Sequence, residues 1–392
     1  MDRYSPAVTL DDDARHELAR LEAQHRLRVP RVVDGMQGPR STVDGVDVLD
    51  LASNDYLSLA ADPRLAAAAR DSIDEDGLGA GASRLIVGNH RRHVALERAV
   101  QDWLRAGAVL SFGSGYATNV GVLSALVGAG DVVISDALNH ASIIDGCRLS
   151  RATAIVVPHG DVAAIERALV ETSGRRRLVV SESLFSMDGD LADVSALSAL
   201  CKRHDAALML DEAHAIGARG PEGRGEAAAY GVTPDLLVGT CGKALGTYGA
   251  FVATTPAIAQ LLWNRARSLV FSTALPPSIA AATTAAIEIV RGSDGEARRR
   301  ALASRARELR ANVSGLGGAA DSAIAPLVIG DDRRVMAMSA RLFERGVFVQ
   351  GIRYPTVAEG TARLRVSLCA GISAEQLEVA TRALNDAVSQ TR

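Results

Sequence analysis

Long hydrophobic runs are absent from this sequence of 392 residues. No apolar stretch approaches the ~18 residues that a membrane-spanning helix needs. The N-terminal region carries three consecutive aspartates at 11–13, where a secretory signal would have an apolar core. We therefore expect a cytoplasmic protein with no membrane partner.

An excess of charge of one sign is also absent. The formal net charge is −3 at pH 7, whereas a nucleic-acid-binding domain would show a basic stripe. Two arginine clusters, at 175–177 and 298–300, are short and have no interleaved aromatic residues, which favours solvated turns or helix faces. We therefore expect no nucleic-acid partner.

Cysteine is scarce and unpatterned. The four cysteines, at 147, 201, 241 and 369, form no C-x-x-C pair. This favours free thiols in a reducing compartment over a disulfide framework. His90 and His93 lie close together in the sequence, but no metal-ligand pattern surrounds them. We expect no metal site.

Short apolar runs alternate with helical stretches from about residue 94 onward. The runs are 108–110, 132–134, 155–157, 178–180, 208–210 and 236–238. Nearly unbroken apolar character is typical of strands in a parallel sheet that is buried on both faces. The length suggests one large domain plus a smaller one. The fold class is therefore α/β, with a large domain over 51–280 that holds a mostly parallel sheet.

The two ends of the chain differ from this middle part. Residues 11–27 have the spacing of a helix and a short strand follows near 43–51, so 1–50 is predicted as an N-terminal helix and strand segment. Asp62-Pro63 starts another helix, and 77–89 look irregular. Residues 281–392 are predicted to form a C-terminal α+β domain. Its strands lie near 324–329 and 363–368, and its last helix begins at a capping box at Ser373.

Two of the apolar runs lead into residues that carry chemistry. The run at 208–210 delivers Asp211, and the run at 236–238 leads into a glycine-rich loop with Lys243. Ligands of open α/β sheets bind at the carboxyl ends of strands, so both side chains can face one crevice. A lysine there can form a Schiff base with the aldehyde of pyridoxal 5′-phosphate (PLP), and a carboxylate can keep the pyridine nitrogen protonated. Taken singly, Asp211 is equally well a helix N-cap, and Lys243 a surface lysine.

Further residues near these strand ends suit the same cofactor. His214 could reach its phenolic oxygen, and Thr240 could donate to its phosphate. The turn at 113–118 follows a strand and opens a helix, where free backbone N–H groups bind phosphate. His140 could lie flat on the pyridine ring, although a lone histidine is more often structural. The set, rather than any one member, predicts a PLP site.

Taken together, these motifs resemble those of the α-oxoamine synthases, PLP-dependent enzymes of the aminotransferase fold (fold type I). The similar segments are 51–57, 139–142, 185–190, 211–214, 240–243, 271–273 and 360–365, in family order over nearly the whole length. The resemblance implies that Lys243 is the Schiff-base lysine and proton-transfer base. It implies that Asp211 pairs with the pyridinium nitrogen and that His140 stacks on the ring.

The resemblance also implies the remaining site residues and a homodimer with its active site between subunits. The residues are His214 and Ser186 at the ring oxygen; Gly115, Tyr116 and Thr240 at the phosphate; Ser272 and Thr273 at the phosphate of the neighbouring subunit; Asn54 and Arg365 at the amino-acid carboxylate; and Arg26 and Thr356 on the acyl-donor side.

Within the family, the closest resemblance is to enzymes of biotin biosynthesis that condense L-alanine with a pimeloyl thioester of CoA or a carrier protein. The products are 8-amino-7-oxononanoate, the free thiol and CO2. Acetyl transfer to glycine and aminolaevulinate synthesis stay open, because pockets separate substrates differing by one methylene by only ~1–3 kcal/mol. An ordinary aminotransferase of this fold is a further alternative. A PLP-binding regulator would need a DNA-binding module, for which residues 1–50 are too short and too acidic.

Overall fold

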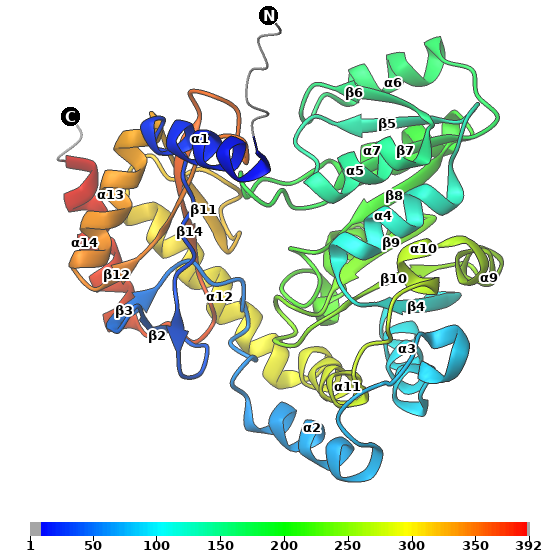
Figure 1. The fold of residues 1–392 in the computed structure, drawn as a ribbon, viewed down its shortest axis with the longest axis horizontal. Helices are drawn as coiled ribbons and strands as arrows, with labels where there is room; N and C mark the ends of the chain where they lie inside the picture. Colours follow the sequence, from blue (N-terminus) through cyan, green and yellow to red (C-terminus); the bar gives the residue numbers. More distant parts are fainter. Residues whose placement is uncertain (1–8, 390–392) are drawn as a thin grey trace, which may run out of the picture.

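A seven-stranded sheet forms the centre of the computed structural model, which describes residues 9–389. Figure 1 shows this sheet in the larger lobe on the right. Its strands, in spatial order, are β4 (Ala108–Phe112), β10 (Ala250–Thr254), β9 (Leu236–Thr240), β8 (Ala207–Asp211), β7 (Arg177–Glu182), β5 (Val132–Asp136) and β6 (Thr153–Val157). Neighbouring strands are parallel except at β10, which is antiparallel to both β4 and β9. The mostly parallel α/β sheet predicted from the apolar runs is confirmed.

Helices cover both faces of this sheet, which explains the apolar runs in its strands; only the edge strand β6 is mostly exposed. Successive strand residues point to opposite faces, so Leu208 and Leu210 enter one core cluster while Met209 enters the other. The first cluster packs against α3 (Arg91–Leu104), α6 (Val162–Glu171) and α7 (Val194–Arg203). The second packs against α4 (Gly115–Leu126), α5 (Ala141–Ser150) and α9 (Pro256–Arg265).

The C-terminal residues build a second, smaller lobe on the left of Figure 1. Its antiparallel sheet has the order β11 (Ile324–Gly330), β14 (Ala362–Ser367), β13 (Gln350–Ile352), and it packs with α13 (Asp332–Glu344) and α14 (Ala374–Ser389). The backbone N–H of Gln376 donates to Ser373 Oγ (3.2 Å), and the N–H of Ser373 donates to Gln376 Oε1 (2.8 Å). The predicted strands and capping box are therefore confirmed.

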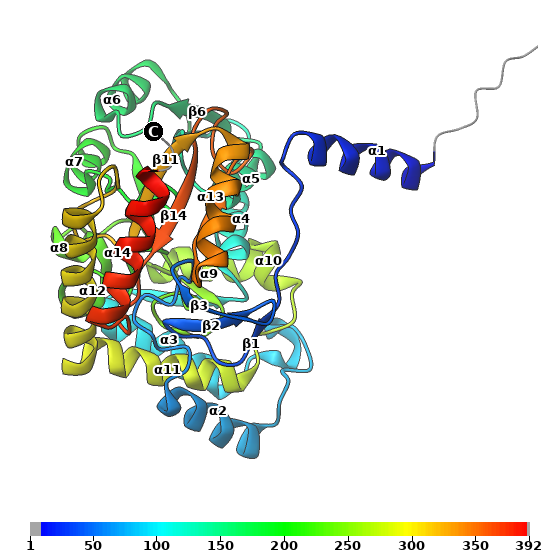
Figure 2. The same ribbon diagram turned by 90° about the vertical axis from the view of Figure 1, so that its left-hand side faces the viewer.

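The N-terminal region joins the smaller lobe through its strands. These are β1 (Val33–Asp34), β2 (Arg40–Val43) and β3 (Val46–Asp50), and β3 pairs in parallel with β12 (Val347–Phe348). The preceding helix α1 (Leu10–Ala23) has no buried residue and stands away from the body in Figure 2. It ends earlier than the predicted residue 27, and His25 just beyond it has a positive φ of 56°, a conformation no helix continues through.

The remaining elements connect the two lobes and complete the large one. They are α2 (Pro63–Asp76), a π-helical turn η1 (Arg84–Gly88), a 3-10 turn η2 (Pro221–Gly223), α8 (Gly225–Ala229), α10 (Arg267–Val270), α11 (Pro277–Arg291) and the long α12 (Ser293–Asn312). The carboxyl group of Asp62 accepts a hydrogen bond from the N–H of Arg64 (3.1 Å), so the predicted helix start is confirmed. Within residues 9–389, no helix combines the length and apolar character needed to cross a membrane.

Candidate active site

Asp211 and Lys243 lie at the same edge of the central sheet. Asp211 is the last residue of β8, and Lys243 follows the end of β9, its parallel neighbour, by three residues. The backbone N–H of Glu212 donates to the carbonyl of Val238 (2.8 Å), which ties the two strand ends together. The two side chains are also close enough for the Asp211 carboxylate to stabilise the charged form of Lys243. The structure therefore places Asp211 and Lys243 side by side, and their joint role at a ligand stays a prediction.

Asp211 anchors one hydrogen-bonded chain of side chains. Its Oδ2 accepts from Asn119 Nδ2 (2.7 Å), and its Oδ1 accepts from the backbone N–H of Ala213 (2.9 Å). The same Asn119 nitrogen donates to Ser142 Oγ (2.9 Å), which lies 2.8 Å from His140 Nδ1. The buried carboxylate and the exposed ring of His140 are therefore held in a fixed relation through α4 and the start of α5.

Lys243 belongs to a second chain. Its Nζ lies 2.8 Å from His214 Nε2, and the other ring nitrogen of His214 lies 2.6 Å from the hydroxyl of Tyr56. Tyr56 and His214 are buried, whereas Lys243 is half-buried. The histidine that the motif predicts to face the cofactor is thus in direct contact with the predicted Schiff-base lysine.

Arg365 brings the small lobe to this cluster. It lies on β14, is buried, and donates from Nη1 to Asn54 Oδ1 (3.1 Å) and from Nε to the carbonyl of Ser186 (2.6 Å). The predicted carboxylate-binding pair, Asn54 and Arg365, is therefore in contact, next to Ser186. A guanidinium offers a planar fork of donors that suits a carboxylate.

Burial shapes the protonation of the residues around Lys243. Loss of hydration lowers the pKa of Lys243 to about 8, although the negative charges of Asp211 and Glu182 oppose the fall. Burial, followed by the Asp211 charge, raises the pKa of Glu182 to about 8. Burial and the charges of Lys243 and Arg365 hold the pKa of His214 well below its usual range, so its ring is neutral. Near pH 8 the Lys243 amine is therefore about half neutral, beside a neutral imidazole.

The turn before α4 has the form of a phosphate cradle. Gly115 is the first helical residue, and Ser114 caps the helix by accepting from the N–H of Ala117 (3.1 Å). A Cβ placed on Gly113 or Gly115 would meet no atom within 4 Å, so open space lies beside this turn. Helix N-termini of this kind bind anions. Tyr116, half-exposed, directs its hydroxyl to Asp145 (2.6 Å).

Within residues 9–389, no side-chain hydrogen bond joins Thr240, Ser272 or Thr273 to Lys243 or His214. Thr240 Oγ1 donates to the carbonyl of Gly249 (3.2 Å) at the end of β9. Ser272 and Thr273 follow α10 and are exposed, and Thr273 forms an isolated antiparallel bridge with Ser83. Their roles at a phosphate stay predictions.

Arg26 and Thr356 lie together in the small lobe. Arg26 pairs with Asp332 (2.9 Å) and lies 4.4 Å from the ring centre of Tyr354, while Thr356 Oγ1 accepts from Arg28 (3.0 Å). In the part of the chain that the structure describes, neither residue touches Lys243, Asp211 or Arg365. Their predicted contact with the acyl donor therefore stays a prediction.

Sequence reasoning missed several members of the cluster. Asn119 lies inside α4, and no local pattern distinguishes it from an ordinary helix residue. Ser142 of α5 belongs to the motif at 139–142, but the motif gave it no role. Glu182 ends β7, next to β8 in the sheet, so its position at a carboxyl strand end was a usable signal. Tyr56 belongs to the motif at 51–57, but its contact with His214 spans 158 positions of sequence.

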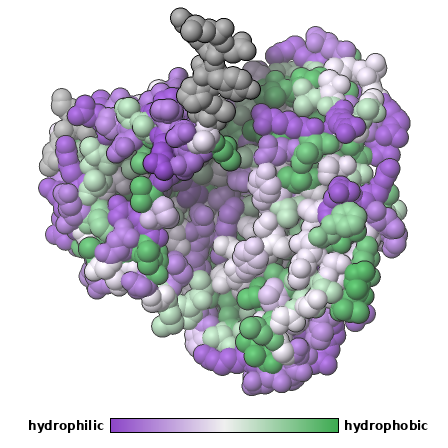
Figure 3. Space-filling view, viewed as in Figure 1, coloured by the Kyte–Doolittle hydropathy of each residue, from purple (hydrophilic) through white to green (hydrophobic). Residues whose placement is uncertain are grey.

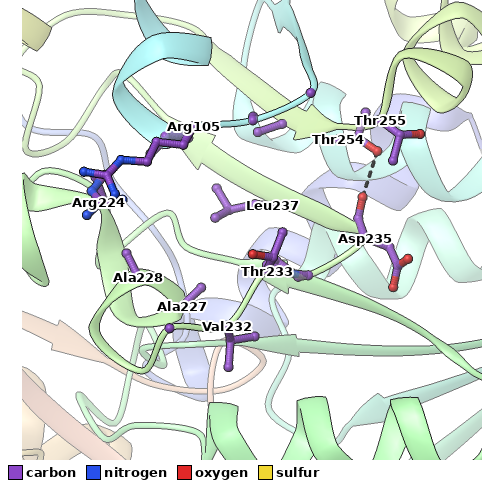
Figure 4. A pocket seen from close by; sticks show the side chains of 16 residues that line it. Arg105, Arg224, Ala227, Ala228, Val232, Thr233, Asp235, Leu237, Thr254 and Thr255 are labelled. Atoms are coloured by element: carbon purple, nitrogen blue, oxygen red, sulfur yellow. Dashed lines mark hydrogen bonds between the residues drawn. The ribbon is translucent and has the colours of Figure 1, made fainter.

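The surface also contains hollows away from these residues. Figure 3 shows the molecule recessed between its two lobes. A separate cavity of about 430 Å³ lies at the amino end of β9, opposite the end that leads to Lys243. Figure 4 shows Arg105 and Arg224 along one side of this cavity, and the hydroxyl of Thr254 bonded to the carbonyl of Asp235 (2.7 Å). This cavity contains none of the predicted site residues.

Among residues 9–389, no group of three or more His, Cys, Asp or Glu side chains is arranged to hold a metal ion.

Comparison with known proteins agrees with this geometry. Residues 46–384 match the family model of class I and II aminotransferases. The 8-amino-7-oxononanoate synthase of Geobacter metallireducens is 47% identical over 92% of this chain and 94% of its own length. The chain belongs to the family of class I and II aminotransferases. Within it, the 8-amino-7-oxononanoate synthase of Thermoanaerobacter pseudethanolicus is a further relative, 41% identical over 95% of both chains.

Solved structures of the family share the fold. A serine palmitoyltransferase from S. paucimobilis, solved with a bound PLP–myriocin aldimine, has a TM-score of 0.91 and is 30% identical, covering 97% of this chain and 98% of its own. An 8-amino-7-oxononanoate synthase from Francisella tularensis has a TM-score of 0.75 and is 26% identical, covering 88% and 98%. The predicted resemblance to PLP-dependent α-oxoamine synthases of fold type I is confirmed.

Proposed function

We propose that this protein is a PLP-dependent acyltransferase that makes 8-amino-7-oxononanoate in biotin biosynthesis. The substrates are L-alanine and pimeloyl-CoA, or the pimeloyl thioester of a carrier protein, and the other products are CoA and CO2. The observation that carries the proposal is the 47% identity, over nearly the whole chain, to a protein named 8-amino-7-oxononanoate synthase. The site geometry supports it, because Asp211 and Lys243 lie at the ends of the adjacent parallel strands β8 and β9.

The residues present suit PLP. Two buried oxygens, Asn119 Oδ1 and Glu182 Oε1, have no hydrogen-bond partner among residues 9–389, and both belong to side chains that surround Asp211 and Lys243. Buried polar atoms in native proteins are normally paired, so a polar ligand fits this crevice. The open cradle at Gly113 and Gly115 suits a phosphate.

Each part of the cofactor has a partner of the right chemistry. Lys243 supplies the amine for the aldehyde, Asp211 a carboxylate for the ring nitrogen, and His140 a ring to stack. His214 and Ser186 suit the ring oxygen, and Gly115, Tyr116 and Thr240 suit the phosphate. When bound, PLP withdraws electrons from the substrate Cα and so stabilises a carbanion.

Lys243 is the base for the Cα proton. Its pKa of about 8 leaves a substantial neutral fraction at physiological pH, and a general base works best with a pKa near the operating pH. Arg365 and Asn54 orient the alanine carboxylate. After Lys243 takes the proton, Cα forms a bond to the thioester carbonyl, the thiolate leaves, the carboxylate departs as CO2, and a proton returns to Cα.

We also propose that the protein acts as a homodimer with its active site between subunits. Ile86, Val87 and Phe271 are 74%, 79% and 71% exposed. The β-bridge between Ser83 and Thr273 brings η1 close to the end of α10. Ile86 and Val87 of η1 and Phe271 after α10 therefore form one apolar patch. Large exposed apolar patches mark interaction surfaces. The patch borders Ser272 and Thr273, the residues expected at a neighbouring subunit's phosphate.

A cytoplasmic location is part of the proposal. Cys147, Cys201, Cys241 and Cys369 are all free and buried. Free buried thiols are typical of proteins that stay in a reducing compartment.

Product identification tests the function. Purified protein is incubated with each combination of one amino acid (alanine, glycine or serine) and one thioester (pimeloyl-, acetyl- or succinyl-CoA). The products are identified by mass spectrometry. The expected result is 8-amino-7-oxononanoate from alanine and pimeloyl-CoA, formed faster than any other product. A faster reaction of glycine with acetyl- or succinyl-CoA would favour the related synthases. Transamination without CoA release would indicate an aminotransferase.

Serine with a long-chain acyl-CoA is a necessary further arm of this experiment. Serine palmitoyltransferases are among the structural neighbours, with TM-scores up to 0.91. Their identity to this chain is 30–31%, below the 41–47% of the 8-amino-7-oxononanoate synthases most similar in sequence. We therefore expect serine and palmitoyl-CoA to give little product.

A further inference from the structure

Tyr56 is the hub of the hydrogen bonds that reach Lys243. It is fully buried, and its hydroxyl oxygen lies 2.6 Å from His214 Nδ1, 3.1 Å from Asn54 Oδ1 and 3.4 Å from Arg365 Nη2. The opposite ring nitrogen of His214 contacts the Lys243 amine at 2.8 Å. One phenol thus connects the residues that face the amino-acid carboxylate with the residue that supplies the base.

The direction of these hydrogen bonds follows from how many protons each group has. A guanidinium has donors only, so Arg365 donates to the Tyr56 oxygen. Tyr56 has a single hydroxyl proton, which goes to either Asn54 or His214. Asn54 Oδ1 accepts from Arg365 Nη1 (3.1 Å) and has a second lone pair for the Tyr56 hydroxyl (3.1 Å), so the two candidate contacts of the hydroxyl differ in length. The 2.6 Å contact to His214 Nδ1 has the short length typical of an O–H donor.

This assignment fixes the tautomer of His214. If Nδ1 accepts from Tyr56, the proton of the neutral imidazole is on Nε2. The Nε2–H group then points at Lys243 and donates to the lone pair of its amine. An ammonium has no lone pair, so this contact favours the neutral form of Lys243.

We propose that Tyr56 is a positioning residue that fixes the His214 tautomer and thereby keeps the Lys243 amine neutral and ready to react. The chain of donors starts at Arg365 and passes through Tyr56 and His214 to Lys243. The inference rests on the proposed function because it assigns a role to Tyr56 within that site. It concerns contacts among this chain's own side chains.

Other charged groups also face the two ends of this chain. Asp211 and Glu182 act on Lys243 from β8 and β7, and Arg365 acts from β14. His140 and Arg365 face His214. These groups are unchanged when Tyr56 loses only its hydroxyl. Tyr56→Phe therefore removes only the hydroxyl, which contacts His214 at 2.6 Å and accepts from Arg365 at the longer distance of 3.4 Å.

The first test follows the capture of PLP by the cofactor-free, full-length protein. Only the neutral amine attacks the aldehyde, so the capture rate, measured by absorbance between pH 6 and 10, rises with a midpoint at the pKa of Lys243. In Tyr56→Phe, His214 can adopt the tautomer with the proton on Nδ1. Nε2 then accepts a hydrogen bond from the Lys243 ammonium and stabilises that charged form. We expect the midpoint to rise by about one unit, and capture at pH 7 to slow about tenfold, the size of one charge-assisted hydrogen bond.

Tyr230→Phe is the matched control, because it makes the same chemical change at an exposed tyrosine at the end of α8. It should leave the midpoint where it is in the parent protein. An unchanged or lowered midpoint in Tyr56→Phe overturns the inference. Equal thermal unfolding midpoints of the two variants verify that both are folded.

A second measurement needs no Tyr56 variant. In the 15N-histidine spectrum of the PLP-free protein, His214 should show a protonated Nε2 and an unprotonated Nδ1, with its signal assigned by loss in His214→Asn. A protonated Nδ1 overturns the inference. These readouts are separable from the function itself: a wrong substrate assignment changes the product identified by mass spectrometry but neither the midpoint nor the tautomer.

Discussion

His159 is the residue whose removal we expect to change the pH dependence of stability most. It follows β6, and its Nδ1 lies 3.0 Å from Asp136 while its Nε2 lies 2.8 Å from Asp190. Hydrogen bonds to these two carboxylates raise the pKa of His159 to about 10. The charged ring thus ties the end of β5 to the loop at 183–190, which carries Ser186.

The magnitude follows from this shift. A rise from 6.5 to about 10 corresponds to about 5 kcal/mol at ~1.36 kcal/mol per unit. The side chain of His159 is 27% exposed, and solvent screening at that exposure about halves the value, to about 2–3 kcal/mol. Because the folded-state pKa is raised, this stability is fully present below pH 6.5 and is lost as the pH rises toward 10.

The assay is urea unfolding of His159→Gln and the parent protein, followed by circular dichroism from pH 6 to pH 10. The free-energy gap between the two should be about 2–3 kcal/mol at pH 6 and should shrink steadily toward pH 10. His16→Gln is the control, since His16 lies on α1, which has no buried residue. A gap of equal size at pH 6 and pH 10 would refute the reasoning.

Three further predictions concern the site and the proposed interface. Asp211→Asn should slow solvent exchange of the alanine Cα proton about 10- to 100-fold, which corresponds to the loss of one charge-assisted hydrogen bond. The exchange rate is measured by NMR in D2O, and an unchanged rate would show that Asp211 does not keep the pyridine nitrogen protonated. Glu182→Gln should keep its activity at pH 7, because burial raises the pKa of Glu182 to about 8 and its carboxyl is mostly protonated there. It should also reduce any loss of activity above pH 8, where the parent carboxyl ionises beside Asp211; a pH–rate profile checks both expectations, and a large loss at pH 7 would contradict the first. Ile86→Asp should be monomeric by light scattering and should retain PLP less well. The control Val170→Asp, at an exposed apolar position of α6, should keep the assembly of the parent protein. A dimeric Ile86→Asp variant would disprove the interface.

The fold was predictable wherever local pattern and burial agree. The apolar runs that became β4, β5, β7, β8 and β9 are buried on both faces, so their sequences carry that constraint directly. The run that became the edge strand β6 is apolar although most of its residues are exposed or half-buried. β10 escaped prediction because Ala250–Thr254 follows a loop with Gly246 and Gly249, and no helix separates it from β9. It is the one strand of the sheet that runs antiparallel to its neighbours.

The site was predictable to the extent that strand ends reveal it. Asp211 and Lys243 follow apolar runs of adjacent strands, and the motifs located His140, His214 and Asn54. The second partners were not predictable, because Asn119 touches Asp211 across 92 positions of sequence and looks like any polar helix residue. The role of His159 was likewise not predictable, because it bridges two carboxylates only after folding places Asp136 and Asp190 beside its two ring nitrogens.

Borohydride reduction identifies the lysine that binds the cofactor aldehyde. The sequence contains only one lysine besides Lys243, namely Lys202, which is exposed on α7. The PLP-loaded protein is reduced with borohydride, digested and mapped by mass spectrometry, alongside Lys243→Ala and Lys202→Ala. We predict a pyridoxyl group on Lys243, retained in Lys202→Ala and lost in Lys243→Ala together with the visible absorbance. A pyridoxyl group on Lys202, or undiminished turnover of Lys243→Ala, would contradict the central claim.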